Sequence, residues 1–305
     1  GNYNVVVGDE AGTAITTGNN NVAVGKSSLS ANTTGAGNNA LGSSALLSNT
    51  TGATNTALGH TSMNQNTTGS NNVAVGSGSL ANNTTAANNT AVGLSALFAN
   101  TTGAANVAVG SNALDANTTG GYNVGIGDRA LGANTTAGGN VGIGADSMFA
   151  NTTGGSNVAL GADSLKANTT ASNNTAVGKA ALGANTTGTL NVAVGALALD
   201  ANQTGAANTA VGYNALSANT GDGATAVGKD ALELNTSGIN TAVGANALAT
   251  VTSGTANVAV GNDALAVNTA ANNTAVGYAS LTANTTGTHN TAVGALALDA
   301  NIGGH

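Results

Sequence analysis

The side chains that could perform acid-base or nucleophilic chemistry are few and scattered in this chain. The histidines are His60, His289 and His305, and there is no cysteine. His60 and His289 fall at unrelated points of an internal repeat, and the acidic residues occupy variable positions typical of a solvated surface. The glycine-rich, aspartate-containing repeat that binds calcium in some solenoids is absent. The sequence therefore predicts no catalytic residue, no metal ligand and no cofactor, and a protein that is not an enzyme.

One polar motif, Asn-Thr-Thr, recurs along the chain. It matches the acceptor sequence for N-linked glycans, so an exposed corner could carry a column of sugars. The alternative is turn chemistry, because asparagine side chains bond the backbone of their own turn. The candidate glycan acceptors are Asn32, Asn49, Asn66, Asn100, Asn117, Asn151 and Asn185.

The threonines of this motif form two further columns. Ordered hydroxyl groups in rows would suit an ice lattice, which makes an ice-binding protein one alternative function. Adjacent residues of a strand point to opposite sides, however, so the two threonines do not obviously share one flat face.

A short repeat positions all of these residues. Glycines equivalent to Gly110, which closes the pentad Asn-Val-Ala-Val-Gly, recur from Gly8 to Gly212 in steps of 17 residues and then in steps of 16 or 17, giving 18 copies. Repeats this short pack only on their neighbours, so we expect one β-solenoid domain over 1–305. Its expected parts are an irregular first coil over 1–18, regular coils over 19–212 and coils with corner deletions over 213–305.

Each copy is best described by positions counted from this glycine as position 0. Val, Ile or Leu at −1 and mostly Val or Thr at −3 alternate with smaller residues, a period typical of a β-strand, and we expect both columns to point into the core. Leu or Met at +4 would complete that core. The constant glycine predicts a corner with positive φ or a crowded backbone. Asn at −4 and +7 would form ladders along the stack. The sequence thus predicts an all-β fold, a parallel β-solenoid (β-roll) of about 18 coils.

Position −2 is restricted to Ala and Gly after the first copy. On the side of the strand that we expect to face outwards, such a column suggests close packing of an identical chain; the alternative is that duplication of the repeat preserves alanine. The predicted oligomer interface includes Ala23, Ala57, Ala91, Ala108, Gly125, Gly142, Ala176 and Ala210.

The composition argues against other partners. The net charge is −7 and only 6% of the residues are charged, so no basic stripe exists to neutralise phosphates, and we expect no nucleic-acid binding. No apolar run approaches the roughly 20 residues of a membrane span, so we expect no membrane insertion of this segment.

The pentad and its variants, Asn-Thr-Ala-Val-Gly and Asn-Val-Gly-Ile-Gly, resemble the head repeat of trimeric autotransporter adhesins of the YadA type. That resemblance implies a homotrimer of left-handed β-rolls, an extracellular or cell-surface location and adhesion to host or surface ligands. The longer unit, with its added Leu-x-Ala-Asn-Thr-Thr-Gly limb, is similar to repeats of bacterial and phage tail-fibre-like surface proteins.

These observations favour an extracellular structural fibre or adhesin rod that assembles with copies of itself, as a homotrimer or a head-to-tail filament, through the Ala/Gly column. The alternatives are an end-to-end self-assembling surface filament without an adhesive role, a phage tail-fibre shaft and an ice-binding protein.

Overall fold

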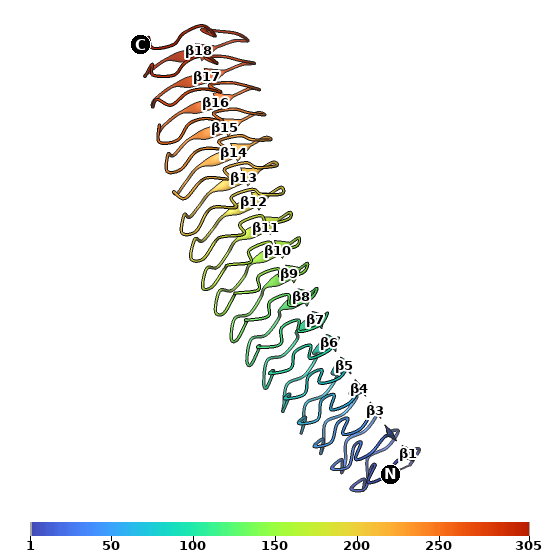
Figure 1. Ribbon diagram of the computed structural model, residues 1–305. Coiled ribbons are helices and arrows are strands. Elements are labelled where there is room, and N and C mark those ends of the chain that lie inside the picture. The colour runs from blue at the N-terminus through green and yellow to red at the C-terminus, as the bar shows by residue number, and fades with distance from the viewer. Residues whose placement is uncertain (1, 305) are drawn as a thin grey trace. The chain divides into compact units, whose positions relative to one another are not determined.

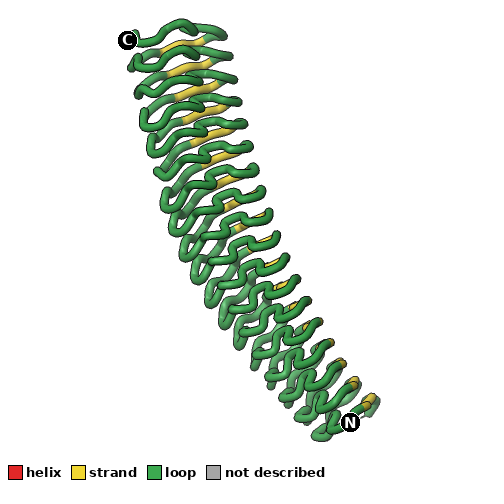
Figure 2. The backbone as a smooth tube through the Cα atoms, in the orientation of Figure 1, coloured by secondary structure: helices red, strands yellow, loops and turns green. Residues whose placement is uncertain are grey.

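A computed structural model describes residues 2–304 of the chain. Every element of regular secondary structure within this range is a β-strand. Figures 1 and 2 show the backbone winding through coils that each carry one short strand. The strands pair in parallel. The predicted fold class, an all-β parallel solenoid, is therefore confirmed. Gly1 and His305, which belong to the predicted domain 1–305, lie outside the described residues.

The chain divides into two compact units, one ending at Gly155 and one beginning at Ser156. The expectation of a single domain stays a prediction. The first unit carries β1 (Val5–Val7), β2 (Val22–Val24), β3 (Asn39–Leu41), β4 (Thr56–Leu58), β5 (Val73–Val75), β6 (Thr90–Val92), β7 (Val107–Val109), β8 (Val124–Ile126) and β9 (Val141–Ile143). The second carries β10 (Val158–Leu160), β11 (Thr175–Val177), β12 (Val192–Val194), β13 (Thr209–Val211), β14 (Thr225–Val227), β15 (Thr241–Val243), β16 (Val258–Val260), β17 (Thr274–Val276) and β18 (Thr291–Val293).

Strand register preserves the repeat position within each unit. In the first unit Val107 pairs with Val124, 17 residues further on, so equivalent side chains stack. In the second unit Thr209 pairs with Thr225, an offset of 16 residues. The missing residue is absorbed at the predicted corner, and the strands keep their alignment because a surface turn tolerates a deletion better than a ladder does.

The inner face of the strands is the opposite of the predicted one. In β7, Ala108 is fully buried, whereas Val107 and Val109 are partly exposed. Alternation with period two shows which residues share a face, but it does not show which face points inwards. The prediction that positions −1 and −3 line the core is therefore wrong, and position −2 lines it instead.

The predicted Ala/Gly interface is consequently an interior column. Space decides its composition, because a Cβ added to Gly125 would lie 3.2 Å from Leu114 Cδ1, leaving room for a methyl group at most. Side chains at −2 cannot contact another chain. The residues concerned, all buried, are Ala23, Ala57, Ala91, Ala108, Gly125, Gly142, Ala176 and Ala210.

The predicted large apolar residue at +4 does lie in the core. Leu or Met at this position is fully buried in every coil from Leu29 to Leu281. Burying one such side chain contributes about 1.5 to 3 kcal/mol. Each interior therefore consists of one large apolar side chain, a few small ones and the asparagines described below.

The constant glycine forms a corner, as predicted, for both of the expected reasons. Gly110 has a φ of +135°, a conformation that other residues rarely adopt. A Cβ there would also lie 2.6 Å from the carbonyl carbon of Gly127 in the next coil. The backbones of adjacent coils thus approach too closely for any side chain.

Left-handed backbone also occurs at residues that are not glycine. Asn112 and Leu114 both have a φ of 53°, and Tyr122 has a φ of 61°. The same positions, +2, +4 and +12, adopt positive φ in most coils. A left-handed residue costs roughly 1 to 2 kcal/mol. For the leucine, burial of its side chain offsets this cost.

Candidate functional surfaces

A column of buried asparagines at −4 joins the two limbs of each coil. Asn106 is fully buried, and its Nδ2 donates a hydrogen bond to the carbonyl oxygen of Gly120 at 2.9 Å. Its Oδ1 accepts the backbone N–H of Asn123, the equivalent residue of the next coil, at 2.9 Å. One amide therefore connects limb to limb and coil to coil.

A second column at +7 runs beside the first. Asn117 Nδ2 donates to Asn100 Oδ1 at 2.8 Å and to the carbonyl oxygen of Gly120 at 3.0 Å. The carbonyl of Gly120 thus accepts hydrogen bonds from both columns. The two predicted asparagine ladders are confirmed, and both lie in the interior, where hydrogen bonds within the ladders pair most of the buried amide groups.

The +7 column also contains the candidate glycan acceptors, and the structure corrects that interpretation. A sugar on Nδ2 would need a path to solvent, but these side chains are fully buried. Turn chemistry, the alternative, explains the motif, since Asn100 Nδ2 bonds the carbonyl of Gly103 in its own turn at 2.9 Å. The predicted glycan acceptors are therefore buried members of the ladder: Asn32, Asn49, Asn66, Asn100, Asn117, Asn151 and Asn185.

The outward side chains at −3 and −1 form what we call the strand face of each unit. Both columns contain only Val, Thr, Ile and Leu apart from Asn39, and no charged residue. Leu41 is 47% exposed and Leu58 is 41% exposed in the first unit, and Leu160 is 45% exposed in the second. The −1 column is apolar throughout, and rows of exposed apolar side chains are typical of an interaction site.

The threonines at +8 and +9 differ in what they bond. At +8, Thr84 Oγ1 donates to the carbonyl oxygen of Thr101 in the next coil at 3.1 Å, and this pattern repeats along the column. At +9 the side chains are exposed. In the central coils of the first unit, the +9 hydroxyls have no hydrogen-bond partner within residues 2–304; these are Thr34, Thr51, Thr68, Thr85, Thr102, Thr119 and Thr136.

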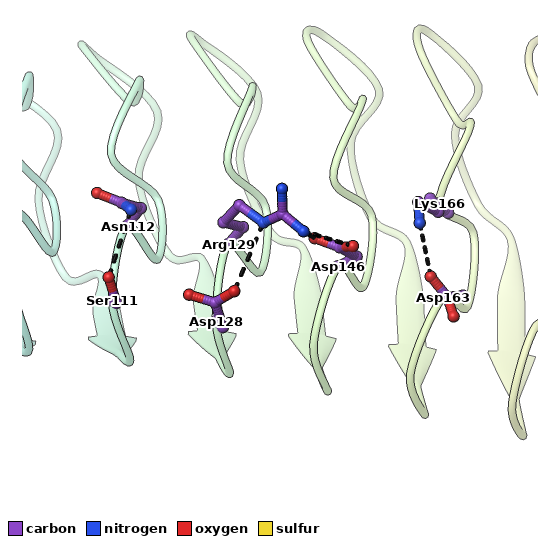
Figure 3. Close-up of polar contacts among 7 residues, drawn as sticks. All are labelled: Ser111, Asn112, Asp128, Arg129, Asp146, Asp163 and Lys166. Atoms are coloured by element: carbon purple, nitrogen blue, oxygen red, sulfur yellow. Dashed lines mark hydrogen bonds and ion pairs between the residues drawn. The ribbon is translucent and has the colours of Figure 1, made fainter.

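The single arginine lies in a small charged cluster on the first unit (Figure 3). Its Nη2 lies 2.9 Å from Asp146 Oδ1 on the next coil, and its Nε lies 3.5 Å from Asp128 Oδ2. The guanidinium of Arg129 also stacks 5.4 Å from the ring centre of Phe149. These contacts bridge two adjacent coils, and the exposed ion pairs add modest stability.

Lys166 and Asp163 form a second ion pair, within the second unit, with Nζ and Oδ1 2.7 Å apart. Elsewhere in that unit Lys229 Nζ lies 2.8 Å from Asp230 Oδ2. The hydrogen bond from Lys229 lowers the pKa of Asp230 and raises that of Lys229.

Two other aspartates, both at +5, have an altered acidity. Burial raises the pKa of Asp115 above its ordinary value of 3.8, and hydrogen bonds from backbone N–H groups oppose this effect. Burial raises the pKa of Asp200 in the same way. Desolvation of the charged carboxylate is the dominant cause in both.

The histidine and acidic side chains do not come together into a site. Among residues 2–304 there is no pocket and no group of three His, Asp or Glu side chains placed to hold a metal ion. Nor does the described part of the chain include a helix that is long and apolar enough to cross a membrane. His60 lies near Thr61 and His289 near Thr288, in different units, while His305 lies outside the described residues.

Comparison with family models and with curated proteins finds no match for this chain. The candidate surfaces are therefore the strand face and the threonine columns. Sequence reasoning missed the outward direction of the strand face. A usable signal was present, because the nearly constant Asn at −4 shares a side of the strand with position −2 and forms the buried ladder.

Proposed function

We propose that this chain is a non-enzymatic structural fibre or adhesin rod, located outside the cell or at its surface, and that it associates with copies of itself through the strand face. The observation that carries the proposal is an uncharged, partly exposed face along successive strands of each unit, with an apolar column at −1 and a column of mostly Val and Thr at −3. Water is released when such columns pack together, and no charge on them opposes the contact.

The strand face of one unit is large enough for a modest contact. A three-residue strand is about 10 Å long, and nine strands at about 4.8 Å spacing extend about 43 Å, so each unit offers roughly 430 Å². Two copies that meet through one unit each would bury about 860 Å² in total, which is in the range of weak, transient contacts and below the roughly 1,200 to 2,000 Å² of a standard interface. Identical copies also share one strand spacing, so their side-chain rows can interdigitate.

The interior supports a structural role. The asparagine ladders pair most of the buried amide groups, Asn202 Oδ1 being an exception, and they connect adjacent coils, as Asn106 and Asn123 illustrate. A face built on such a ladder keeps its side chains in fixed positions, which reduces the entropy lost on association. The resemblance to trimeric adhesin heads adds the expectation of three chains and of a surface ligand.

The test is the oligomeric state of paired lysine variants. Val107→Lys with Val141→Lys places two charges on the strand face of the first unit. Ser111→Lys with Ala145→Lys places the same charges in the same coils but at position +1, off that face. Sedimentation velocity should give a multiple of the 28.5 kDa chain mass for the unchanged protein and the control, and the monomer mass for the strand-face variant.

Two results would contradict the proposal. One is an unchanged protein that sediments as a monomer at every concentration. The other is a strand-face variant that keeps its assembly state while its far-ultraviolet circular dichroism matches the control. Negative-stain electron microscopy of the same samples distinguishes discrete three-chain particles, the adhesin form, from continuous head-to-tail filaments.

A further inference from the structure

We propose that the row of +9 threonines on the first unit binds an ordered water lattice, the surface of ice. This proposal does not rest on the proposed function, because the +9 residues do not belong to the strand face. The row consists of Thr17, Thr34, Thr51, Thr68, Thr85, Thr102, Thr119, Thr136 and Thr153, one from each coil of that unit.

The fold explains the threonines at +8 but not those at +9. The hydroxyl of Thr84, at +8, bonds the carbonyl of Thr101 and so helps to join two coils. The hydroxyl of Thr85, its neighbour at +9, makes no hydrogen bond to the described residues and is exposed. A hydroxyl is thus repeated at +9 in the central coils although no hydrogen bond among residues 2–304 uses it.

Other exposed corner positions in the same coils are variable. Position +1 holds His60, Ser77, Leu94 and Ser111 in four successive coils, whereas +9 is Thr in all nine coils of the first unit. The second unit lacks this regularity, because Gly221 follows directly after the +8 residue Thr220 and no +9 residue remains. The uninterrupted row is therefore a feature of the first unit.

The backbone beneath the row is held firmly. The N–H groups of Thr33, Thr34 and Gly35 all donate to the carbonyl oxygen of Thr50, at 2.9, 3.2 and 3.4 Å. The hydroxyl of Thr33 donates to the same oxygen at 3.1 Å. Four donors on one acceptor fix the turn that carries Thr34, so little backbone freedom is lost there on binding.

The spacing and chemistry of the row suit ice. Coils stack at about 4.8 Å, close to the repeat between neighbouring oxygen rows in an ice crystal, and the constant 17-residue register keeps that interval from coil to coil. Each threonine offers a hydroxyl that can join the lattice and a methyl group around which water orders. Neither threonine column of the first unit contains a charge, which would hold liquid water more strongly, or an aromatic ring on which a sugar could stack.

The test uses the full chain and measures thermal hysteresis, the gap between the melting and freezing points of a seeded ice crystal. Thr85→Lys with Thr102→Lys disrupts the middle of the row. Ser77→Lys with Leu94→Lys adds the same charges to the same two coils at position +1. We expect thermal hysteresis for the unchanged protein and for the control, and loss of it for the row variant.

The proposal is overturned if the unchanged protein shows no thermal hysteresis above that of serum albumin, or if the row variant retains it in full. Equal loss in both variants would also overturn it, since charge alone would then explain the effect. Because all four substituted side chains are exposed, circular dichroism melts should match the unchanged protein. Sedimentation of the same samples tests self-association separately.

Discussion

At the scale of single residues, buried asparagines hold the coils together, a task that a larger hydrophobic core performs in other folds. Asn100 donates to Asn83 Oδ1 at 3.0 Å and to the carbonyl of Gly103 at 2.9 Å, and it accepts from Asn117 at 2.8 Å. The sequence was sufficient to predict these ladders, because the amides recur at fixed positions. It was not sufficient to predict their burial, since the same motif also reads as an exposed turn.

Removing one ladder amide should be costly. Asn100→Ala deletes three hydrogen bonds and leaves Asn83 Oδ1 and one N–H of Asn117 without a partner, so we expect a loss of about 3 kcal/mol in the free energy of unfolding. The control is Thr119→Ala, an exposed change expected to stay within about 0.5 kcal/mol. Urea denaturation measures both, and equal midpoints would contradict a structural role for the ladder.

Asp115 makes the stability depend on pH in a defined direction. Because burial raises its pKa in the folded chain above 3.8, the folded state binds the proton more tightly than the unfolded state does. Stability from this group therefore rises as pH falls towards 3.8. Asp115→Asn should be more stable than the unchanged protein at pH 7, and thermal melts should show this advantage shrinking as pH falls through the raised pKa. An advantage that is constant with pH would contradict it.

Asp230 acts in the opposite sense. Its pKa is lowered by the hydrogen bond from Lys229, so its contribution is present above pH 3.8 and is lost as pH falls through the lower folded value. Asp230 is present in both the Asp115→Asn variant and the unchanged protein, so its contribution to stability cancels in the comparison. The difference between the two proteins therefore reports on Asp115 alone.

At the scale of the coil, the predicted strand at −3 to −1, the corners and the core leucine are in place, and one orientation is reversed. The repeat also predicts a second short strand in each coil, but turns take its place within residues 2–304. The strands, the corner glycines, the buried +4 residue and the shortened turns follow from the repeat. Which face of the strand points inwards does not follow from the strand alone, because the pattern of Val107, Ala108 and Val109 allows either face to be buried. What decides it is Leu114, which is fully buried and leaves space for only a methyl group at −2. Its left-handed backbone could not be foreseen, since leucine rarely adopts that conformation.

The corner glycine offers a test of how closely coils approach. Gly110→Ala would force a Cβ to 2.6 Å from the carbonyl carbon of Gly127 at a φ of +135°, and we expect a loss of more than about 3 kcal/mol. Gly78→Ala is the matched control, because its φ is +66° and its nearest atom would lie 3.6 Å away. Ala180 already occupies the equivalent position with a φ of 54°.

The control should therefore lose only about 1 to 2 kcal/mol. Chemical denaturation of both variants gives the comparison. Similar losses for Gly110→Ala and Gly78→Ala would mean that the coils are further apart at the corner than the structure places them.

At the scale of the whole molecule, each coil is too small to be stable alone. One buried leucine contributes about 1.5 to 3 kcal/mol, whereas ordering the backbone of 17 residues costs at least about 17 kcal/mol, so stacking must supply the difference. The same stacking places two uncharged columns, one apolar and one of mostly Val and Thr, on the outside of each unit. The proposed self-association through the strand face would explain why those columns carry no charge.

The most direct test of this account is thiol labelling of two single-cysteine variants, which is clean because the chain has no cysteine of its own. Val107→Cys should react with a water-soluble maleimide at a rate that rises on dilution, as copies separate. Ala108→Cys should stay protected at every concentration until the protein unfolds. If the Ala108→Cys variant instead reacts at least as fast as the Val107→Cys variant in the folded, diluted protein, the strand points the other way and the account fails.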